Sequence, residues 1–334
     1  MDVPELGFPC AGPDGRPLTE PLSLSIPEYS PTPMETLTVA IVTDASDRFV
    51  EWNYLLRLFV RAWEKRNIKV VVVRDDASYQ PADIAFLHAD LTVVPEACLA
   101  VCRRYARVIN GGAIDIQKRF FSDLLLTPES AWAGPVIVKT EWNCGGWREF
   151  RMWLESTLVG RALQRFGGFE TYHKFRARQE ARRSWSRRRL LPYGQYPVFD
   201  KRADVPKGVW KNPNLVVEKF LAEKEGNEFY CRHWVFLGER EATFRSYSID
   251  PVVKLTGRIE RHNDVVPDDL REIRKNLGFD YGKFDYAIVN GKTVLYDVNR
   301  TPAASVEARY AWAIPNLELG IDEFLVPTRL TVTV

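Results

Sequence analysis

Two aspartates and an asparagine near the end of the sequence have residue types and spacing that suit a metal site. They lie in KFDYAIVNGKTVLYDVNRTP (283–302), where two runs rich in β-branched and aromatic residues flank an Asn-Gly pair. This pattern predicts a β-hairpin. Side chains alternate between the two faces of a strand, so Asp297 and Asn299 would share a face, and Asp285 would come close to Asp297 near the open end of the hairpin.

Two neighbouring carboxylates repel each other unless a cation neutralises them. Oxygen donors from Asp285, Asp297 and Asn299 suit Mg²⁺, which usually takes one or two carboxylates from the protein and its other ligands from water and phosphate. An exposed hairpin whose acids face solvent would explain the same residues. The hairpin alone leaves both interpretations open.

A lysine followed by a glycine-bearing loop is the second feature that could do chemistry. Lys139 ends the apolar run GPVIVK, and TEWNCGGWRE follows it. Such a loop can wrap phosphate oxygens with its backbone while the ammonium supplies a point charge. Further on, alternation in EGNEFYCRHW puts Glu228 and Arg232 on one face of a strand. That pair would either bind a ligand or form a structural ion pair within the sheet.

The composition is that of an ordinary globular protein. The chain has 334 residues, of which 46% are hydrophobic and 27% charged, and its net charge of +2 argues against bulk polyanion binding. No run approaches the roughly 18 apolar residues of a membrane helix, and the N-terminus lacks signal-peptide features, so we expect a soluble, cytoplasmic protein with no membrane partner. The five cysteines are odd in number and lack metal-type spacing, which argues against a disulfide framework.

The elements that must position these residues begin with two dissimilar segments. Residues 1–36 are rich in Pro and Gly without periodicity and predict an extended arm on the body of the protein or a disordered tail. From residue 37 to about residue 112, strand and helix patterns alternate, which predicts a small doubly wound α/β lobe (37–112). Residues 113–126 have helical spacing and would form a helix that leaves this lobe.

A basic segment interrupts the region that follows. TYHKFRARQEARRSWSRRRLL (171–191) holds eight Lys or Arg and one Glu. It would be a lid over an anionic substrate, an arm that binds nucleic acid, or a solvated helix face. The low net charge makes nucleic acid the weaker option, but the basic segment 171–190 keeps it open.

The order of these pieces resembles the ATP-grasp superfamily, especially its D-alanine-D-alanine ligase-like and RimK-like carboxylate-amine ligases. The resemblance covers about residues 37–305. Its most specific part is the C-terminal motif, where family members have an Asp, a hairpin, Glu-x-Asn and a Ser/Thr-Pro pair. The counterparts here are Asp285, Asp297, Asn299 and Thr301-Pro302, with Asp297 in place of the usual Glu.

The resemblance implies an α/β fold in which a small doubly wound lobe precedes two α+β lobes that clamp ATP. The first of these, 113–221, would carry the phosphate loop and a basic insertion at about 171–214. The second, 222–334, would carry the Mg-ATP site.

The resemblance also implies roles for individual residues. The nucleotide would be held at the phosphates by Lys118, Lys139 and a loop with Gly145 and Gly146, at the adenine by Glu218, Lys219, Phe220 and Leu221, and at the ribose by Glu228. Three basic residues would be catalytic: Arg232 near the γ-phosphate, Lys283 beside a tetrahedral intermediate, and Arg245 on the following strand.

In members of this family a substrate carboxylate attacks the γ-phosphate, and an amine or similar nucleophile then displaces phosphate from the acylphosphate. The resemblance therefore implies ATP and Mg²⁺ as cofactors, with Mn²⁺ as a substitute, and small-molecule or peptide carboxylates and amines as substrates. No Ser/His/Asp or Cys/His arrangement stands out among the four histidines, which fits a reaction that needs positioning and charge neutralisation.

Two other classes stay open: an ATP-grasp kinase that phosphorylates a hydroxyl, and a non-catalytic protein that binds nucleotide or nucleic acid. The oligomeric state is also open, with a homodimer as one option.

Overall fold

The structure, a computed structural model, describes residues 36–192, 194–255, 257–304 and 309–325. The predicted extended arm therefore lies outside the described residues, apart from its last residue. Within these ranges no helix is both long enough and apolar enough to cross a membrane.

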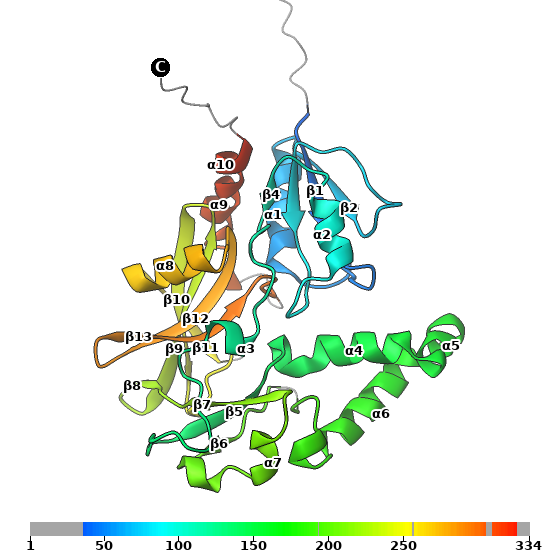
Figure 1. Ribbon diagram of the computed structural model, residues 1–334. Helices are drawn as coiled ribbons and strands as arrows, with labels where there is room; N and C mark the ends of the chain where they lie inside the picture. Colours follow the sequence, from blue (N-terminus) through cyan, green and yellow to red (C-terminus); the bar gives the residue numbers. More distant parts are fainter. Residues whose placement is uncertain (1–35, 193, 256, 305–308, 326–334) are drawn as a thin grey trace, which may run out of the picture. The chain divides into compact units, whose positions relative to one another are not determined.

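The first lobe is a parallel sheet with helices on both faces (Figure 1), which confirms the predicted doubly wound α/β lobe. Alternate residues of the first strand explain this, because Val39 and Ile41 pack in one apolar cluster with the first helix, while Ala40 and Val42 pack in another with the second. The sheet order is β2-β1-β3-β4, and the elements are β1 (Thr38–Val42), α1 (Leu55–Lys65), β2 (Lys69–Val73), β3 (Ile84–Leu87), α2 (Glu96–Cys102) and β4 (Val108–Ile109).

The middle lobe contains a three-stranded antiparallel sheet of order β6-β5-β7. Most of the helices of this lobe lie between β5 and β6 in the sequence. Its elements are α3 (Lys118–Phe121), β5 (Val136–Thr140), the 3-10 helix η1 (Asn143–Gly146), α4 (Trp147–Ser156), α5 (Leu158–Phe166), α6 (Phe169–Ala181), η2 (Trp185–Arg187), β6 (Val198–Phe199), η3 (Arg202–Asp204), α7 (Lys207–Trp210) and β7 (Leu215–Lys219).

The structure modifies two expectations for this lobe, the helix over 113–126 and the basic insertion. Of the helix predicted over 113–126, only α3 forms, because the backbone before and after it bonds to neighbouring segments: Ile116 N–H donates to the Thr92 carbonyl, and Leu126 N–H to that of Val217. The basic insertion of about 171–214 is no detached arm, because its residues Leu191 and Val209 pack into the core of the lobe beside Val136.

The third lobe is a six-stranded antiparallel sheet of order β11-β10-β9-β12-β13, with β8 paired to β9. Its elements are β8 (Glu223–Glu225), β9 (Glu228–Leu237), β10 (Arg240–Ser248), β11 (Arg258–His262), α8 (Asp268–Asn276), β12 (Tyr281–Val289), β13 (Lys292–Asn299), α9 (Ile314–Leu317), η5 (Glu318–Ile321) and α10 (Asp322–Leu325).

The predicted hairpin forms between β12 and β13, the latter orange in Figure 1. Asn290 and Gly291 both have positive φ, 51° and 72°, as a two-residue hairpin turn of the Asn-Gly type requires. The register shifts after the Asp285–Asp297 pair, where Tyr286 pairs with Leu295 and Tyr296 is left as a bulge. The bulge lies next to the predicted metal ligands.

The first lobe and the large sheet share one apolar core. Phe59 and Phe86 of the first lobe contact the ring of Tyr281 on β12, with ring centroids 5.8 and 5.1 Å away. Asn110, in the left-handed conformation at a φ of 61°, joins the same two regions by four hydrogen bonds to Asp280 and Tyr281. These contacts fix the hairpin against the first lobe.

Candidate functional site

The two hairpin acids face each other across the strands, as predicted. Asp285 pairs with Asp297, and Lys283 pairs with Asn299, so the four side chains share one face of the sheet. Directly opposed residues have Cβ atoms about 5 Å apart. Two carboxylates, a lysine and an amide therefore project from neighbouring positions on one face of the hairpin.

Asp285 already has two cationic or donor partners within the protein. Lys283 Nζ lies 2.5 Å from its Oδ1, and His233 Nδ1 lies 2.7 Å from the same atom. Burial by itself would raise the pKa of Asp285, but Lys283 and His233 outweigh it and hold that pKa below its usual value. Burial would likewise lower the pKa of Lys283, yet Asp285 raises it. Asp285 is therefore ionised and Lys283 charged.

Asp297 is less fully compensated. Its side chain is 33% exposed, and its nearest cation, Lys118 Nζ, is 3.4 Å away. Lys118 is almost fully buried, which would lower its pKa, but Asp297 and Glu218 outweigh burial and raise that pKa. The lysine predicted to contact phosphate is thus a charged group at the hairpin.

The second predicted phosphate lysine reaches the same strand. Lys139 Nζ donates to the Tyr296 carbonyl at 2.9 Å and lies 2.7 Å from the fully buried carboxylate of Glu218. Despite that ion pair, no hydrogen bond with good geometry reaches either Glu218 oxygen from the described residues. The Tyr296 hydroxyl donates to the carbonyl of Leu221. The hairpin, both lysines and the segment 218–221 are thus brought together.

Lys219 and Phe220 continue this segment, and their backbone N–H groups bond to the carbonyls of Leu124 and Pro135 at 2.9 Å each. Both side chains are partly exposed. The backbone at the predicted adenine segment is therefore anchored on one side by its own lobe and on the other by Tyr296.

The glycine loop has the conformation that its sequence suggests. Gly145 and Gly146 have φ of 69° and 79°, in the left-handed region that glycine favours. A Cβ on Gly146 would come within 3.0 Å of the Arg189 carbonyl oxygen. Leu191 N–H donates to the Gly145 carbonyl at 3.3 Å. The basic segment therefore packs directly on the loop predicted to cover phosphate.

Arg232 and Arg245 lie elsewhere than predicted. They are cross-strand partners on the face of Trp234, which packs with α8, while His233, one residue along β9, faces Asp285. Arg232 pairs with Glu223 at 2.8 Å, and both arginines pair with Asp264. The structure gives no contact between either arginine and the hairpin acids, so the γ-phosphate role of Arg232 and the catalytic role of Arg245 stay predictions without geometric support.

Glu228, the predicted ribose acid, is also separate from the hairpin acids. Its side chain is 40% exposed, and it pairs with Arg258 of β11. The sequence left open a structural ion pair between Glu228 and Arg232. Arg232 does form an ion pair on this face of the sheet, but its acidic partner is Glu223.

The structure reveals a Ser-His-Asp row that sequence reasoning did not find. His233 Nε2 lies 2.6 Å from Ser246 Oγ, and its Nδ1 contacts Asp285. Burial lowers the pKa of His233 more than Asp285 raises it, so the imidazole is neutral: Nδ1–H donates to the ionised Asp285, and Nε2 accepts from the serine hydroxyl. Ser246 is fully buried, so the row orients Asp285 and leaves no accessible nucleophile. Nothing in the sequence indicates which residues of β9, β10 and β12 lie opposite one another, so this row could not be predicted.

The donor set suits Mg²⁺ by its chemistry, since Asp285, Asp297 and Asn299 all offer oxygen atoms. The Asn299 amide oxygen also accepts from Thr301 N–H at 2.8 Å, which fixes its direction. Among the described residues there is no group of three or more His, Cys, Asp or Glu that could hold a metal. Water and phosphate would therefore have to complete the coordination.

No family model and no curated protein matches this sequence. Solved structures similar to it include a RimK domain ATP-grasp protein from Sphaerobacter thermophilus, with 11% identity, 86% of this chain and 100% of that chain covered, and a TM-score of 0.46. D-alanine–D-alanine ligase from Bacillus anthracis has 10% identity, covers 86% and 96%, and has a TM-score of 0.41. The ATP-grasp ligase PsnB, complexed with minimal precursor, has 10% identity, 87% and 99% coverage, and a TM-score of 0.48.

Two of these three are described as ATP-grasp proteins, the superfamily that the sequence resembles. Because the identities are low and the TM-scores lie below 0.5, we base the function on this chain's own residues.

Proposed function

We propose that this chain is an ATP-dependent ligase of the ATP-grasp type, which activates a substrate carboxylate as an acylphosphate and joins it to an amine or similar nucleophile. One observation carries the proposal. Lys118 and Lys139, from two elements of the middle lobe, both reach residues 296–297 of the hairpin. Two buried ammonium groups beside two carboxylates match a polyphosphate with its metal ion.

Each part of the nucleotide has residues to hold it. Lys118, Lys139 and the loop at Gly145 and Gly146 would bind the phosphates. The segment 218–221 would bind adenine through its backbone and through Oε1 of Glu218, the oxygen that is not paired with Lys139. Asp285, Asp297 and Asn299 would hold Mg²⁺. When bound, the metal ion neutralises phosphate charge and aligns the phosphoryl group.

In the reaction, a carboxylate oxygen of the substrate attacks the γ-phosphorus, and the bond from that phosphorus to ADP breaks. The nucleophile then attacks the acyl carbon, and phosphate leaves. The protein's part is to place these groups and to supply positive charge where negative charge collects. Lys283 contributes by holding Asp285 ionised and fixed. A kinase would use the same nucleotide site and differ in its acceptor alone.

The test is an ADP-release screen over carboxylates and amines, with the products read by mass spectrometry. We expect an amide or related product, and we expect Asp297→Asn to lower turnover by more than the roughly 10- to 100-fold that loss of an outer-shell metal partner causes. Asp268→Asn, which removes an exposed acid of α8, is the control. A phosphorylated hydroxyl product would make the chain a kinase, and Mg²⁺-independent turnover in Asp297→Asn would remove the metal assignment.

A further inference from the structure

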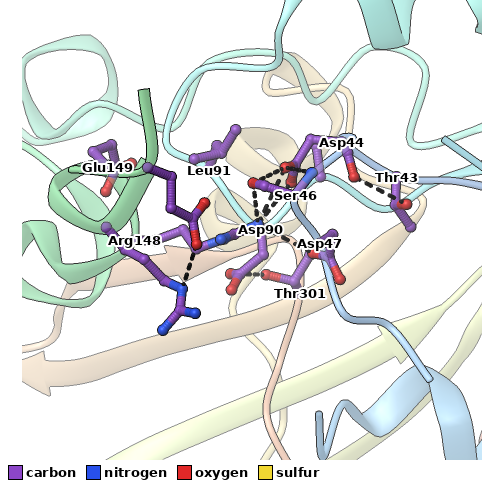
Figure 2. A network of polar contacts seen from close by, with 12 residues as sticks. Thr43, Asp44, Ser46, Asp47, Asp90, Leu91, Arg148, Glu149 and Thr301 are labelled. Carbon is purple, nitrogen blue, oxygen red and sulfur yellow. Dashed lines mark hydrogen bonds and ion pairs between the residues drawn. The ribbon is translucent and has the colours of Figure 1, made fainter. Parts of the chain in front are cut away.

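Three aspartates gather at one edge of the first sheet, outside the nucleotide site. Asp44 follows β1 by two residues, Asp90 follows β3 by three, and Asp47 lies in the turn after Asp44. The carboxyl ends of parallel strands meet at the same edge of a sheet, which is where ligands of α/β lobes bind. Figure 2 shows these residues with Arg148 and Thr301.

The hydrogen bonds of Tyr54 reveal a missing donor. Its hydroxyl lies 3.1 Å from Asp47 Oδ2 and 3.1 Å from Asp90 Oδ2. A phenol has one hydrogen to donate, so it cannot satisfy both carboxylates when both are ionised. The other oxygen of Asp47, Oδ1, is buried and has no hydrogen-bond partner among the described residues, although Asp47 is only 2% exposed.

The cations nearby do not supply this donor. Arg148 Nη2 is committed to Asp44, 3.1 Å from both of its oxygens, and lies 4.0 Å from Asp47, while Nε and Nη1 of Arg148 are buried and make no hydrogen bond to Asp47 or to any other described residue. Arg300 is fully buried, but its guanidinium donates to backbone carbonyls. Burial, followed by the charge of Asp44, raises the pKa of Asp47 to about 7. In this arrangement no donor from the described residues reaches Asp47 Oδ1.

The cluster is connected to the hairpin by two hydrogen bonds. Thr301 Oγ1 donates to Asp90 Oδ1 at 2.7 Å, and Thr301 N–H donates to the Asn299 amide at 2.8 Å. Asp90 is partly exposed, so a ligand can reach it. A cation held at Asp90 would thus lie next to the residues proposed to hold the metal.

We propose that Asp47, Asp90 and Tyr54 bind the nucleophile of the proposed ligase, on which the inference rests, through its primary ammonium group. Before the nitrogen attacks the acyl carbon, the ammonium gives up one proton, for which the partly exposed Asp90 is an acceptor. An ammonium has one charge and three N–H donors, enough for the unpaired oxygen of Asp47, for Asp90 and for the Tyr54 oxygen. An ammonium suits a site whose buried acceptor oxygen lacks a donor, because it brings N–H groups as well as charge.

The first test uses the unmodified protein. Calorimetry, in the presence of a non-hydrolysable ATP analogue, measures the Kd of pairs of compounds, each a primary amine that supports ADP release and its N-acetylated form. We expect the acetylated forms, which keep the skeleton and lose the charge, to bind at least tenfold more weakly. Equal Kd for both members of each pair would overturn the ammonium site and leave the ligase proposal standing.

The second test uses Asp47→Asn and Asp90→Asn. Each removes one charge, so the KM for the amine should rise about tenfold or more, as for other charge-assisted hydrogen bonds, while the Kd of a non-hydrolysable ATP analogue changes less than twofold. Asp76→Asn, which removes an exposed acid of the same lobe that pairs with Arg104, should behave as the wild type. An unchanged amine KM in both variants would overturn the inference.

Two further measurements cover a variant that does not fold and a wild type that shows no nucleotide activity. If Asp47→Asn does not fold, as judged by its thermal transition, the partly exposed Asp90→Asn carries the test. If the wild type neither binds the ATP analogue nor releases ADP, the ligase proposal fails. Calorimetry with ethylammonium chloride then tests the ammonium site alone, which stands if the wild type binds it more tightly than Asp90→Asn and falls if the two are equal.

Discussion

The large sheet meets its two neighbours through interfaces of opposite character. Against the first lobe it shares a single apolar core, in which Phe59, Phe86 and Tyr281 are in contact and Asn110 bonds across. Against the middle lobe the apolar contact is small, and charged or polar groups carry the rest, chiefly Lys118 with Asp297.

The difference shows where a ligand can enter. Separating two apolar surfaces costs free energy because both become exposed to water, and a small polar ligand does not offset that cost. Ion pairs and hydrogen bonds can be exchanged for others of similar strength when an anion or a metal ion arrives. The polar interface is therefore the one suited to open and close around a nucleotide, while the apolar interface holds the hairpin in a fixed place.

Loss of Lys139 should have the largest effect on the polar side. Lys139→Ala leaves the fully buried carboxylate of Glu218 without the ammonium 2.7 Å away, which should lower the free energy of unfolding by about 3 to 5 kcal/mol. The double variant Lys139→Met with Glu218→Gln should recover most of that loss, because no charge stays buried alone. Urea denaturation measures both.

The same variants separate structure from binding. If Lys139 also holds phosphate, both should bind a non-hydrolysable ATP analogue about tenfold more weakly or worse, whatever their stability. Equal stability of the single and double variants would show that the ion pair does not stabilise the fold, and wild-type affinity in the double variant would remove Lys139 from the nucleotide site.

On the apolar side, His88 should make stability depend on pH. It is fully buried against the rings of Phe49 and Tyr54, and neither ring nitrogen has a hydrogen-bond partner among the described residues. Burial, followed by the charge of Arg300, lowers the pKa of His88 to about 3. The unfolded chain, with a His pKa of about 6.5, binds more protons than the folded one below that pH. Stability is therefore lost as pH falls from about 6.5 toward 3.

Between pH 7 and pH 4 this loss should be about 3 kcal/mol, and it should be absent from His88→Leu. The raised pKa of Asp47 acts in the opposite sense, since the folded chain then binds the extra proton and gains stability as pH falls from about 7 to 4. Comparing the pH slopes of the wild type and His88→Leu cancels that contribution. His262→Gln is the control, and equal slopes in the wild type and His88→Leu would contradict the assignment.

Asn110 should have a smaller effect, restricted to the apolar interface. Asn110→Ala removes three side-chain hydrogen bonds to Asp280 and Tyr281 and keeps a non-glycine residue at a φ of 61°. The exposed Asn67 has nearly the same φ, 60°, so Asn67→Ala reports the backbone cost alone. We expect Asn110→Ala to be less stable than Asn67→Ala by about 2 kcal/mol, with ATP-analogue affinity unchanged in both. A difference near zero would mean that Asn110 does not join the two regions.

The basic segment should give the smallest effect on stability. Arg183 pairs with Glu180, and Arg188 stacks on Trp185, whereas Arg182 and Arg187 are exposed. Replacing these last two by Gln should change the free energy of unfolding by less than about 0.5 kcal/mol. If the segment covers an anionic substrate, the KM for the carboxylate should rise and lose part of its dependence on salt. Arg103→Gln, on the first lobe, is the control, and an identical salt dependence would exclude the lid.

The sequence predicted best what local rules determine. The hairpin follows from Asn290-Gly291 and from alternation, and α8 follows from paired acids at its start and Gly278 after its end. The doubly wound lobe follows from the alternation of apolar strands with an amphipathic helix. In each case the signal lies within about ten residues.

What the sequence missed depends on register between distant strands. Moving one residue along β9 exchanges the face of the sheet. Arg232, predicted to lie near the γ-phosphate, is on the face opposite Asp285, and His233 is the residue of β9 that contacts Asp285. The contacts of Lys118 and Lys139 with the hairpin came from resemblance to a family and not from pattern, because no local rule joins residues about 160 to 180 apart. The lack of a hydrogen-bond partner for Asp47 Oδ1 could not be predicted from the sequence, because it depends on the positions of all the side chains packed around that atom.

The position of Arg300 late in the chain determines when, during synthesis, the ammonium site can form. Its side chain donates to the carbonyls of Ala89, Leu91 and Ala113, which precede it by 211, 209 and 187 residues. At typical rates of synthesis, about 200 residues take roughly 10 to 40 s. Throughout that interval the loop that carries Asp90 has already left the ribosome but lacks the guanidinium that ties it down. The edge of the first sheet that carries Asp90 therefore stays unfinished until Arg300 has been made, and the ammonium site becomes complete at nearly the same moment as the hairpin beside it.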